Sequence, residues 1–376
     1  MDFSFTPEQE MLRDSLARYF ADRYSFSRRQ AMVRSEQGWA AGTWRGLADE
    51  LGVLGAGFDP DVGGLGGGAV EHLVVMEEIG RALVIEPYLE TAVLGGGLLR
   101  RWNSPRAREW IGRIVDGEVR FAFAHLEPPA RYDLQHVTTR ATRQSDGWVL
   151  DGLKDAVRGA PFATHLLVTA RTTGADHDRR GIATFLVAAD AAGLALRRYA
   201  TVDGSRAGDV RFTGARAELL ASADDGFDAL EAAVDEAIAG LCAEAVGVMR
   251  RLLADTVEYT KQRRQFDAPI AANQVLQHRM VDMYMRVEQA VSMTYLATLS
   301  LSRPPAQRMR AVSAAKVFVA DAARFVGQAA VQLHGGMGMT DELAVSHYFK
   351  RATMIESQFG SADHHAHRLE SLAPDA

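Results

Sequence analysis

The sequence predicts an α+β protein in which a block of short strands separates two helical blocks. Residues 1–118 carry apolar side chains at helical spacing, and residues 119–220 carry short β-like runs between turn residues. Residues 221–376 return to long helical patterns. These three observations favour an N-terminal helical domain, a middle antiparallel β domain and a C-terminal helical bundle, with boundaries at these positions.

The N-terminal block opens with a well-defined helix start. Thr6 can cap the first turn, Pro7 suits the first helical position, and Gln9 stands where a capping box needs a glutamine. Further along, a glycine run occupies residues 63–68. Because no strand precedes this run, we expect a turn between helices rather than a phosphate-binding loop.

The middle block contains six short runs without intervening helices. Turn residues such as Asp146-Gly147, Gly174 and Asp203-Gly204 separate them. Short strands in this arrangement indicate an antiparallel sheet or a small barrel. The runs are RFAFAHL, HVTTRAT, WVLDG, HLLVTAR, GIATFLV and DVRFTG.

The C-terminal block contains three long helical segments, near residues 223–262, 273–302 and 306–334. Pro304-Pro305 separates the last two, because proline cannot continue the interior of a helix. Long helices joined by short connections predict a bundle.

Composition and charge exclude several classes of function. The formal net charge of −6 gives no basic footprint for nucleic acid. No charge-free stretch reaches the length of a membrane span, and the N-terminus carries acids where a signal peptide needs a cationic start. The single cysteine, Cys242, suits a reducing compartment. We therefore expect a cytoplasmic protein with no nucleic-acid or membrane partner.

Several motifs stand in a recognisable order along the whole chain. The sequence YTKQRRQFDAPI fills residues 259–270, and QLHGGMGMT fills residues 332–340. Near the start stands MDFSFTPEQEMLRDSLARYF, and HLEPPARYD occupies residues 125–133. Together these motifs resemble the flavin-dependent acyl-CoA dehydrogenase family. The resemblance implies FAD as cofactor, an acyl-CoA as substrate and an electron-transfer flavoprotein as electron acceptor.

The resemblance also implies which residues hold the adenine and pyrophosphate end of FAD, across a subunit interface. Arg263 would bind the pyrophosphate, and Phe266 would pack near the adenine. Gln332, Gly335 and Gly336 would let backbone amides approach the cofactor closely. Without the resemblance, Arg263 would be interpreted as a solvated charge, Phe266 as a core residue and the two glycines as a helix C-cap.

The half of the site that should face the flavin ring departs from the family pattern. Lys154 is kept in the K-x-W-I-T-N strand, but the small hydroxyl donors are lost. Each lost hydrogen bond is worth about 0.5–1.5 kcal/mol net. The replacements are Leu126 for threonine in T-E-P, Arg131 and Tyr132 for glycine and serine in G-S-D, Ala156 for tryptophan and Arg158 for threonine.

The general base expected from the resemblance is missing. The family's E-G-T or E-G-S glutamate is replaced by phenylalanine in Phe359-Gly360-Ser361, and phenylalanine cannot accept a proton. Glu244, on an apolar helical stripe, is the candidate for a relocated base, or else one half of a structural ion pair with Arg250 or Arg279. Glu356 would reach the position only through a register slip.

The histidines near the C-terminus favour no metal site. His364 and His367 share a helical face, but histidines on a terminal helix are commonly surface residues, and the resembled fold uses no metal. We expect His334 and His347 to line the cofactor or an interface instead.

Three hypotheses remain. The chain is a self-sufficient homotetrameric acyl-CoA dehydrogenase with a relocated base, a subunit of a heteromeric enzyme of the bacterial steroid side-chain type, or a scaffold without flavin. The heteromer is favoured, because it explains why the adenine half is retained while the ring half and the base are not. In the first two cases the expected reaction is FAD-dependent α,β-dehydrogenation of an acyl-CoA.

Overall fold

The computed structural model describes residues 4–128, 130–222 and 226–372. The chain forms two compact units. One unit combines residues 1–30, 69–84 and 238–376, and the other combines residues 31–68 and 85–237. Each unit thus draws on more than one of the expected sequence blocks, and the boundaries at 118/119 and 220/221 stay a prediction.

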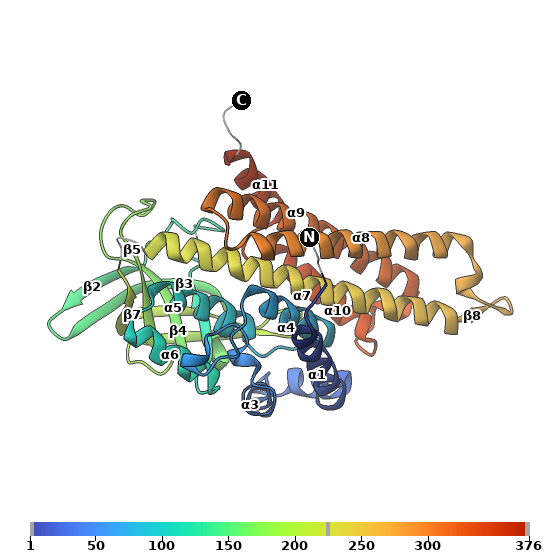
Figure 1. Ribbon diagram of the computed structural model, residues 1–376, viewed down its shortest axis with the longest axis horizontal. Helices are drawn as coiled ribbons and strands as arrows, with labels where there is room; N and C mark the ends of the chain where they lie inside the picture. Colours follow the sequence, from blue (N-terminus) through green and yellow to red (C-terminus); the bar gives the residue numbers. More distant parts are fainter. Residues whose placement is uncertain (1–3, 129, 223–225, 373–376) are drawn as a thin grey trace. The chain divides into compact units, whose positions relative to one another are not determined.

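The first unit is helical, and Figure 1 shows its long helices α8 and α9, which pack along each other. Thr6 and Gln9 form the expected capping box at the start of α1. Its elements are α1 (Pro7–Arg23), α2 (Phe26–Arg34, continuing past residue 30), α4 (Ala69–Ala82), α7 (Gly226–Gln262, beginning before residue 238), α8 (Gln274–Ser300), α9 (Pro305–His334), α10 (Ala344–Ser357), α11 (Ala362–Ser371), the strands β8 (Arg264–Gln265) and β9 (Ala268–Pro269), and the short turns η6 (Ile270–Ala272) and η7 (Gly335–Met339).

Two glycines set the crossing of α4 and α7. A Cβ built on Gly80 would lie 2.0 Å from the carbonyl oxygen of Glu244, and one built on Gly247 would lie 1.9 Å from that of Glu77. Each helix therefore places a glycine against a backbone carbonyl of the other, which any side chain would push away.

The second unit contains a seven-stranded sheet and several short helices. The glycine run forms the expected turn in this unit, since the N–H groups of Gly63 and Gly64 donate to the carbonyls of Pro60 and Asp59 at 3.0 Å. The elements are α3 (Ala41–Arg45), η1 (Gly46–Glu50), η2 (Val53–Gly55), η3 (Pro60–Val62), η4 (Leu89–Gly95), α5 (Gly96–Trp102), α6 (Pro105–Val115), η5 (Ala160–Phe162), β1 (Phe121–Ala124), β2 (Arg140–Gln144), β3 (Gly147–Arg158), β4 (His165–Arg171), β5 (Ile182–Ala188), β6 (Leu194–Ala200) and β7 (Arg206–Ala221).

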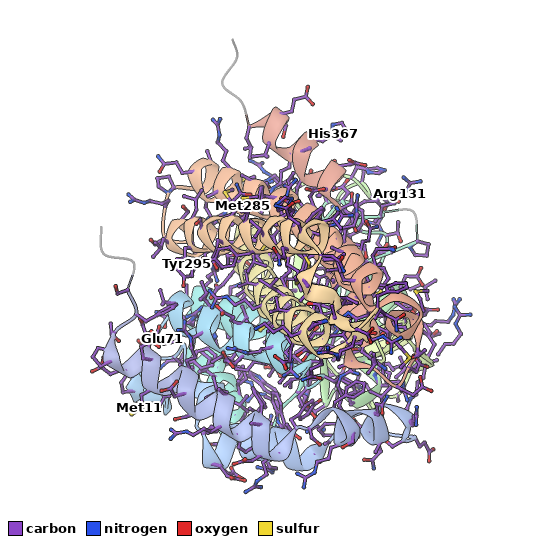
Figure 2. The ribbon with its side chains drawn as sticks, turned by 90° about the vertical axis from the view of Figure 1, so that its right-hand side faces the viewer. Met11, Glu71, Arg131, Met285, Tyr295 and His367 are labelled. Atoms are coloured by element: carbon purple, nitrogen blue, oxygen red, sulfur yellow. The ribbon has the colours of Figure 1, made fainter. Side chains whose placement is uncertain are left out.

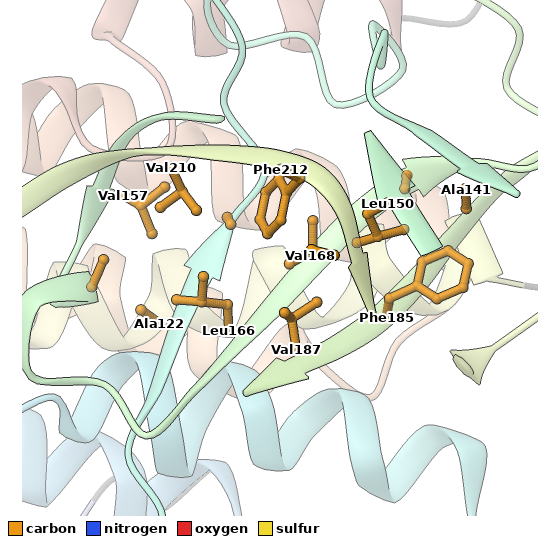
Figure 3. Close-up of a cluster of buried hydrophobic side chains, with 14 of the residues drawn as sticks. Ala122, Ala141, Leu150, Val157, Leu166, Val168, Phe185, Val187, Val210 and Phe212 are labelled. Atoms are coloured by element: carbon orange, nitrogen blue, oxygen red, sulfur yellow. The ribbon is translucent and has the colours of Figure 1, made fainter. Parts of the chain in front are cut away.

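The sheet closes on itself as a small barrel. Pairings run from β4 through β2, β3, β7 and β5 and return to β4, with β1 attached to β4 and β6 to β7. Alternate residues of these strands fill the interior, as Figure 3 shows for Leu166 and Val168 on β4 and Phe185 and Val187 on β5. The expected fold class is confirmed.

Two strands differ from expectation. β1 pairs parallel with β4, because the β2–β3 hairpin lies between them in the chain and lets both enter the sheet in the same direction. β6 was not among the expected runs, since Arg197 and Arg198 interrupt its apolar alternation. In the described part of the chain, no helix is both long enough and apolar enough to cross a membrane.

Candidate active site

The ends of α7 and α9 meet through one aromatic pair. The rings of Tyr259 and His334 stack with centroids 4.3 Å apart and an interplanar angle of 25°. The Tyr259 hydroxyl also donates to the backbone carbonyl of His334 at 3.3 Å. This contact holds the segment that follows α7 and the segment that follows α9 at the same end of the helical unit.

A short β-hairpin, with two residues in each strand, follows α7 and carries Phe266 in its turn. Arg264 pairs with Pro269 and Gln265 with Ala268, which leaves Phe266 and Asp267 as the turn. Both turn residues have positive φ, 49° and 60°, as a type I′ turn requires. A phenylalanine is strained there. Its side chain is 99% exposed, so the alternative that Phe266 belongs to the core of this chain is wrong.

Arg263 and Gln332 both lie on the surface beside this contact. The backbone N–H of Arg263 donates to the carbonyl of Tyr259 at 2.8 Å, and its own carbonyl accepts from Ile270 at 2.9 Å. Both side chains are exposed, and neither pairs with another described side chain. Their polar heads are therefore available to a ligand or to another chain.

The glycines after α9 have different local roles. Gly335 ends α9 with φ 62° and ψ −144°, a conformation that belongs almost only to glycine. Gly336 lies outside the left-handed region, and a Cβ added to it would meet nothing within 4 Å. The C-cap reading thus accounts for Gly335, while no packing inside this chain requires a glycine at 336.

The other compact unit holds Arg158 in a buried acidic cluster. Its guanidinium lies 3.1 Å from the Asp203 carboxylate and 3.4 Å from the Glu90 carboxylate. Its Nη2 donates to the Ser205 hydroxyl at 3.0 Å. Asp203 is 1% exposed and Glu90 7%, so the arginine neutralises two buried acids. Its donors are directed into the chain itself.

Lys154 and Glu127 tie the loop that follows β1 to β3. The Lys154 ammonium donates to the Glu127 carboxylate at 2.7 Å and to the Thr169 hydroxyl at 2.9 Å. Backbone N–H groups of Thr138 and Thr139 donate to the same carboxylate. Burial opposes ionisation of Glu127, but the Lys154 charge and these hydrogen bonds outweigh it and hold its pKa at about 2. Burial lowers the pKa of Lys154 to about 8.

Two of the replaced residues adopt unusual backbone conformations. Ala156 has φ 50° at an irregularity in the β3–β7 pairing, and its N–H donates to the Asp209 carboxylate at 3.2 Å. Arg131 has φ 51°. Leu126 accepts a backbone hydrogen bond from Asp155 at 2.8 Å, which adds a second tie between this loop and β3.

His365 holds the backbone at Phe359, where the family's base is expected. The sequence alone did not point to this histidine. Phe359 has φ 57°, and its carbonyl lies 3.0 Å from His365 Nε2. The other ring nitrogen, Nδ1, lies 3.1 Å from the Ser313 hydroxyl. Since a carbonyl only accepts, Nε2 carries the proton and Ser313 donates to Nδ1. Burial lowers the pKa of His365 to about 3, so the ring stays neutral.

Glu244 forms a bidentate ion pair with Arg351. The two nitrogen–oxygen distances are 2.5 and 2.7 Å, and both residues are buried. Neither expected partner is used, because Arg250 pairs with Glu77 and Arg279 packs over the ring of Phe325. Arg351 was missed because it lies 107 residues away in sequence.

The remaining candidates lie apart from this site. Glu356 pairs with Arg324. His347 lies against Phe26, with ring centroids 5.0 Å apart. His367 is exposed beside Glu370, while the neighbouring His365 turns inward. Among the described residues no group of three or more histidine, cysteine, aspartate or glutamate side chains could hold a metal ion.

Family models match almost the whole chain. The N-terminal, middle and C-terminal domains of acyl-CoA dehydrogenase match residues 6–118, 122–215 and 224–370. The chain therefore belongs to the acyl-CoA dehydrogenase family, whose members are oxidoreductases that act on CH–CH bonds. The family recognised from the motifs is confirmed.

Individual relatives agree with this assignment. The acyl-CoA dehydrogenase FadE12 of Mycobacterium tuberculosis is 30% identical over 368 residues, which cover 92% of this chain and 91% of FadE12. Among solved structures, a Tcur3481–Tcur3483 steroid ACAD variant is 28% identical with a TM-score of 0.88, covering 97% of each chain. The ChsE4–ChsE5 complex from Mycobacterium tuberculosis is 27% identical with a TM-score of 0.89, covering 100% of each chain.

Proposed function

We propose that this chain takes part in FAD-dependent α,β-dehydrogenation of an acyl-CoA thioester as one subunit of a heteromeric complex. It lends the adenine-side residues of a shared FAD site to a related partner chain. One contrast carries the proposal: Arg263, Phe266 and Gln332 are exposed and pair with no other described side chain. By contrast, Arg158, at the expected flavin-ring position, is held in the chain's own acidic cluster.

The residues at the end of the helical unit suit the adenine and pyrophosphate half of FAD. Arg263 offers a multi-donor cation for the pyrophosphate, and Phe266 offers an apolar face for the adenine. The empty space around Gly336 leaves room for a cofactor to approach the backbone. When bound, FAD supplies the acceptor for the hydride that leaves the β-carbon.

In this proposal the partner supplies the flavin-ring side and the general base. Phe359 has no proton acceptor, and the Glu244 carboxylate already receives two donors from Arg351. We assign Glu244 a structural role, holding α7 to α10. The self-sufficient homotetramer, with Glu244 as base, would require this ion pair to open during catalysis.

An exposed apolar face on α8 supports assembly with another chain. Large apolar side chains are about half or more exposed along this helix at helical spacing, and Figure 2 labels Met285 among them. Solved relatives include complexes of two different chains, such as ChsE4–ChsE5. The residues of this face are Val275, Val281, Tyr284, Met285, Leu296 and Leu299.

The acyl-CoA substrate, the transfer of electrons to an electron-transfer flavoprotein and a cytoplasmic location belong to the same proposal. Family membership supports the first two, and the single buried cysteine, Cys242, agrees with a reducing compartment. A scaffold without flavin would have no need for an exposed arginine and a strained, exposed phenylalanine side by side.

The test uses this chain co-expressed with a related acyl-CoA dehydrogenase chain that carries the family glutamate. Arg263→Met should lower the FAD content of the complex, while Lys261→Met, an exposed cation two residues away, should leave it unchanged. Unaltered FAD content with Arg263→Met would refute the assignment of the adenine-side residues.

A further inference from the structure

The β-containing unit has a cavity of about 600 Å³ that the site described above does not use. This volume falls in the range of roughly 300–1,000 Å³ typical of small-molecule sites. The cavity lies where the 36–39 segment meets β6 and the start of β7. It is lined by Glu36, Gln37, Trp39, Pro161, Arg198, Tyr199, Ala200 and Arg206.

The arginines around this cavity lack acidic partners. Arg198 is exposed and pairs with no described side chain. Arg206 donates only to backbone carbonyls, those of Val33 at 2.8 Å and Ser35 at 3.1 Å. Arg120, behind Trp39, likewise donates to a carbonyl. Among the described residues of the lining the sole carboxylate is Glu36, which is exposed, so the cavity carries excess positive charge on a chain of net charge −6.

The aromatic side chains of the cavity are held in place. The Arg120 guanidinium lies 4.5 Å from the Trp39 ring centroid, and Phe162 packs on Trp39 with ring centroids 5.8 Å apart. The Tyr199 hydroxyl donates to Asp209 at 2.8 Å, which holds this ring on the face of β6 opposite Arg198, because successive side chains of a strand point to opposite faces. The Trp39 ring is half-buried, so it has surface left to contact a ligand.

Gly38 fixes the path of Arg206. It has φ 69°, and a Cβ built on it would lie 2.6 Å from Arg206 Nε. The arginine therefore crosses the backbone at a position that only glycine leaves open. With two carbonyls bound at one end, its guanidinium is oriented before any ligand arrives.

We propose that this cavity binds a nucleotide, with the phosphates on Arg198 and Arg206 and the base against Trp39. Guanidinium groups match phosphate oxygens in a bidentate manner, and aromatic side chains stack with bases. The same chemistry occurs in a free nucleotide such as ADP and in the nucleotide end of coenzyme A.

A nucleotide bound in this cavity would lie near the residues that hold Arg158. The carbonyl of Arg206 accepts from the N–H of Gly159 at 2.9 Å, and the adjacent Ser205 accepts from the Arg158 guanidinium. The pairing of β3 with β7 therefore connects the cavity to the acidic cluster at the expected flavin-ring position. The assignment of a nucleotide does not depend on the proposed dehydrogenase function.

Isothermal titration calorimetry on the full chain, or on its complex with the partner chain, tests the proposal with ADP, coenzyme A, adenosine and pyrophosphate. ADP, coenzyme A or both should bind, and adenosine and pyrophosphate should each bind about tenfold more weakly or worse. Binding by coenzyme A alone assigns its nucleotide end as the ligand, whereas equal binding of ADP assigns a free nucleotide.

Variants locate the bound nucleotide. Arg198→Gln should raise Kd about tenfold or more, because a charge-assisted contact is lost. Arg211→Gln, which alters an exposed arginine on β7, should not change Kd. Trp39→Leu should weaken the binding of the nucleotide but not the binding of pyrophosphate. Absence of nucleotide binding, or nucleotide binding that Arg198→Gln leaves unchanged, would overturn the proposal.

Discussion

Tyr259 and His334 stack at 4.3 Å and join the last turn of α7 to the last turn of α9. The imidazole is itself fixed, since its Nδ1 lies 2.8 Å from the carbonyl of Ala330. Two motifs whose stacked residues lie 75 positions apart in sequence thereby meet at one surface. That surface exposes Arg263, Phe266 and Gln332, which supports a contribution to a site completed by another chain.

Substitution of the two adjacent glycines should separate local strain from cofactor contact. Gly335→Ala should lower the free energy of unfolding by about 1–3 kcal/mol, because φ 62° with ψ −144° strains alanine. Gly336→Ala should leave the free energy of unfolding unchanged, since its Cβ meets nothing. If the backbone at 336 contacts FAD, the same variant should reduce the FAD content of the complex. Denaturant unfolding and the visible spectrum measure the two effects, and full FAD content in Gly336→Ala would contradict the contact.

Removal of the Phe266 side chain should leave the isolated chain no less stable but should harm the complex. Phe266→Gly replaces a residue that is strained at φ 49° with one that tolerates this angle. Glycine costs about 0.5–1 kcal/mol because it makes the unfolded chain more flexible. The relief of strain offsets this cost, so the free energy of unfolding should not fall. FAD content of the complex should fall because the apolar face is gone. Phe266→Asn, which also tolerates positive φ, is the matched control for hairpin geometry. A large loss of stability in both variants would show that Phe266 packs within its own chain.

The Lys154–Glu127 pair should stabilise the β unit in a pH-dependent manner. Glu127→Gln leaves a buried ammonium without its counterion and should cost about 3–5 kcal/mol, whereas the double variant Glu127→Gln/Lys154→Met should be less damaging. The folded pKa of Glu127, about 2, lies below its ordinary 4.5. Its stabilising contribution is therefore complete above pH 4.5 and is lost as the pH falls toward 2. Acid unfolding curves of wild type and Glu127→Gln that run parallel across this window would contradict the assignment.

Glu244 should matter for stability rather than for proton transfer. Glu244→Gln removes the counterion of buried Arg351 and should cost about 3–5 kcal/mol of stability. In the complex, kcat of the Glu244→Gln variant should not fall by the roughly 10²–10⁴-fold that follows removal of a general base. The double variant Glu244→Gln/Arg351→Met, which removes both charges, is the control if the single variant unfolds. A stable Glu244→Gln protein that binds substrate but does not turn over would identify Glu244 as the base.

Local sequence signals predicted the elements they govern. The capping box at Thr6, the helix break at Pro304-Pro305 and most barrel strands follow from short-range preferences, which act the same way in the folded chain. β6 escaped because its pairing with β7, rather than an apolar pattern, makes it a strand.

Side-chain partners across the fold could not be predicted in this way. Glu244 was recognised as a buried carboxylate, but its partner Arg351 comes from α10, and Arg158 could not be linked to Glu90 and Asp203 without the fold. The exposure of Phe266 follows from a hairpin only two residues long on each side, which carries no clear strand signal. Such contacts depend on tertiary placement, which periodicity does not encode.

The ratio of FAD to protein in this chain, purified alone and after co-expression with a related chain that carries the family glutamate, tests the central claim most directly. We expect a colourless product from the chain alone and about one FAD for every two chains in the complex, because two different subunits would share each site. A yellow homo-oligomer with about one FAD per chain would contradict it, because the chain would then complete its own flavin site.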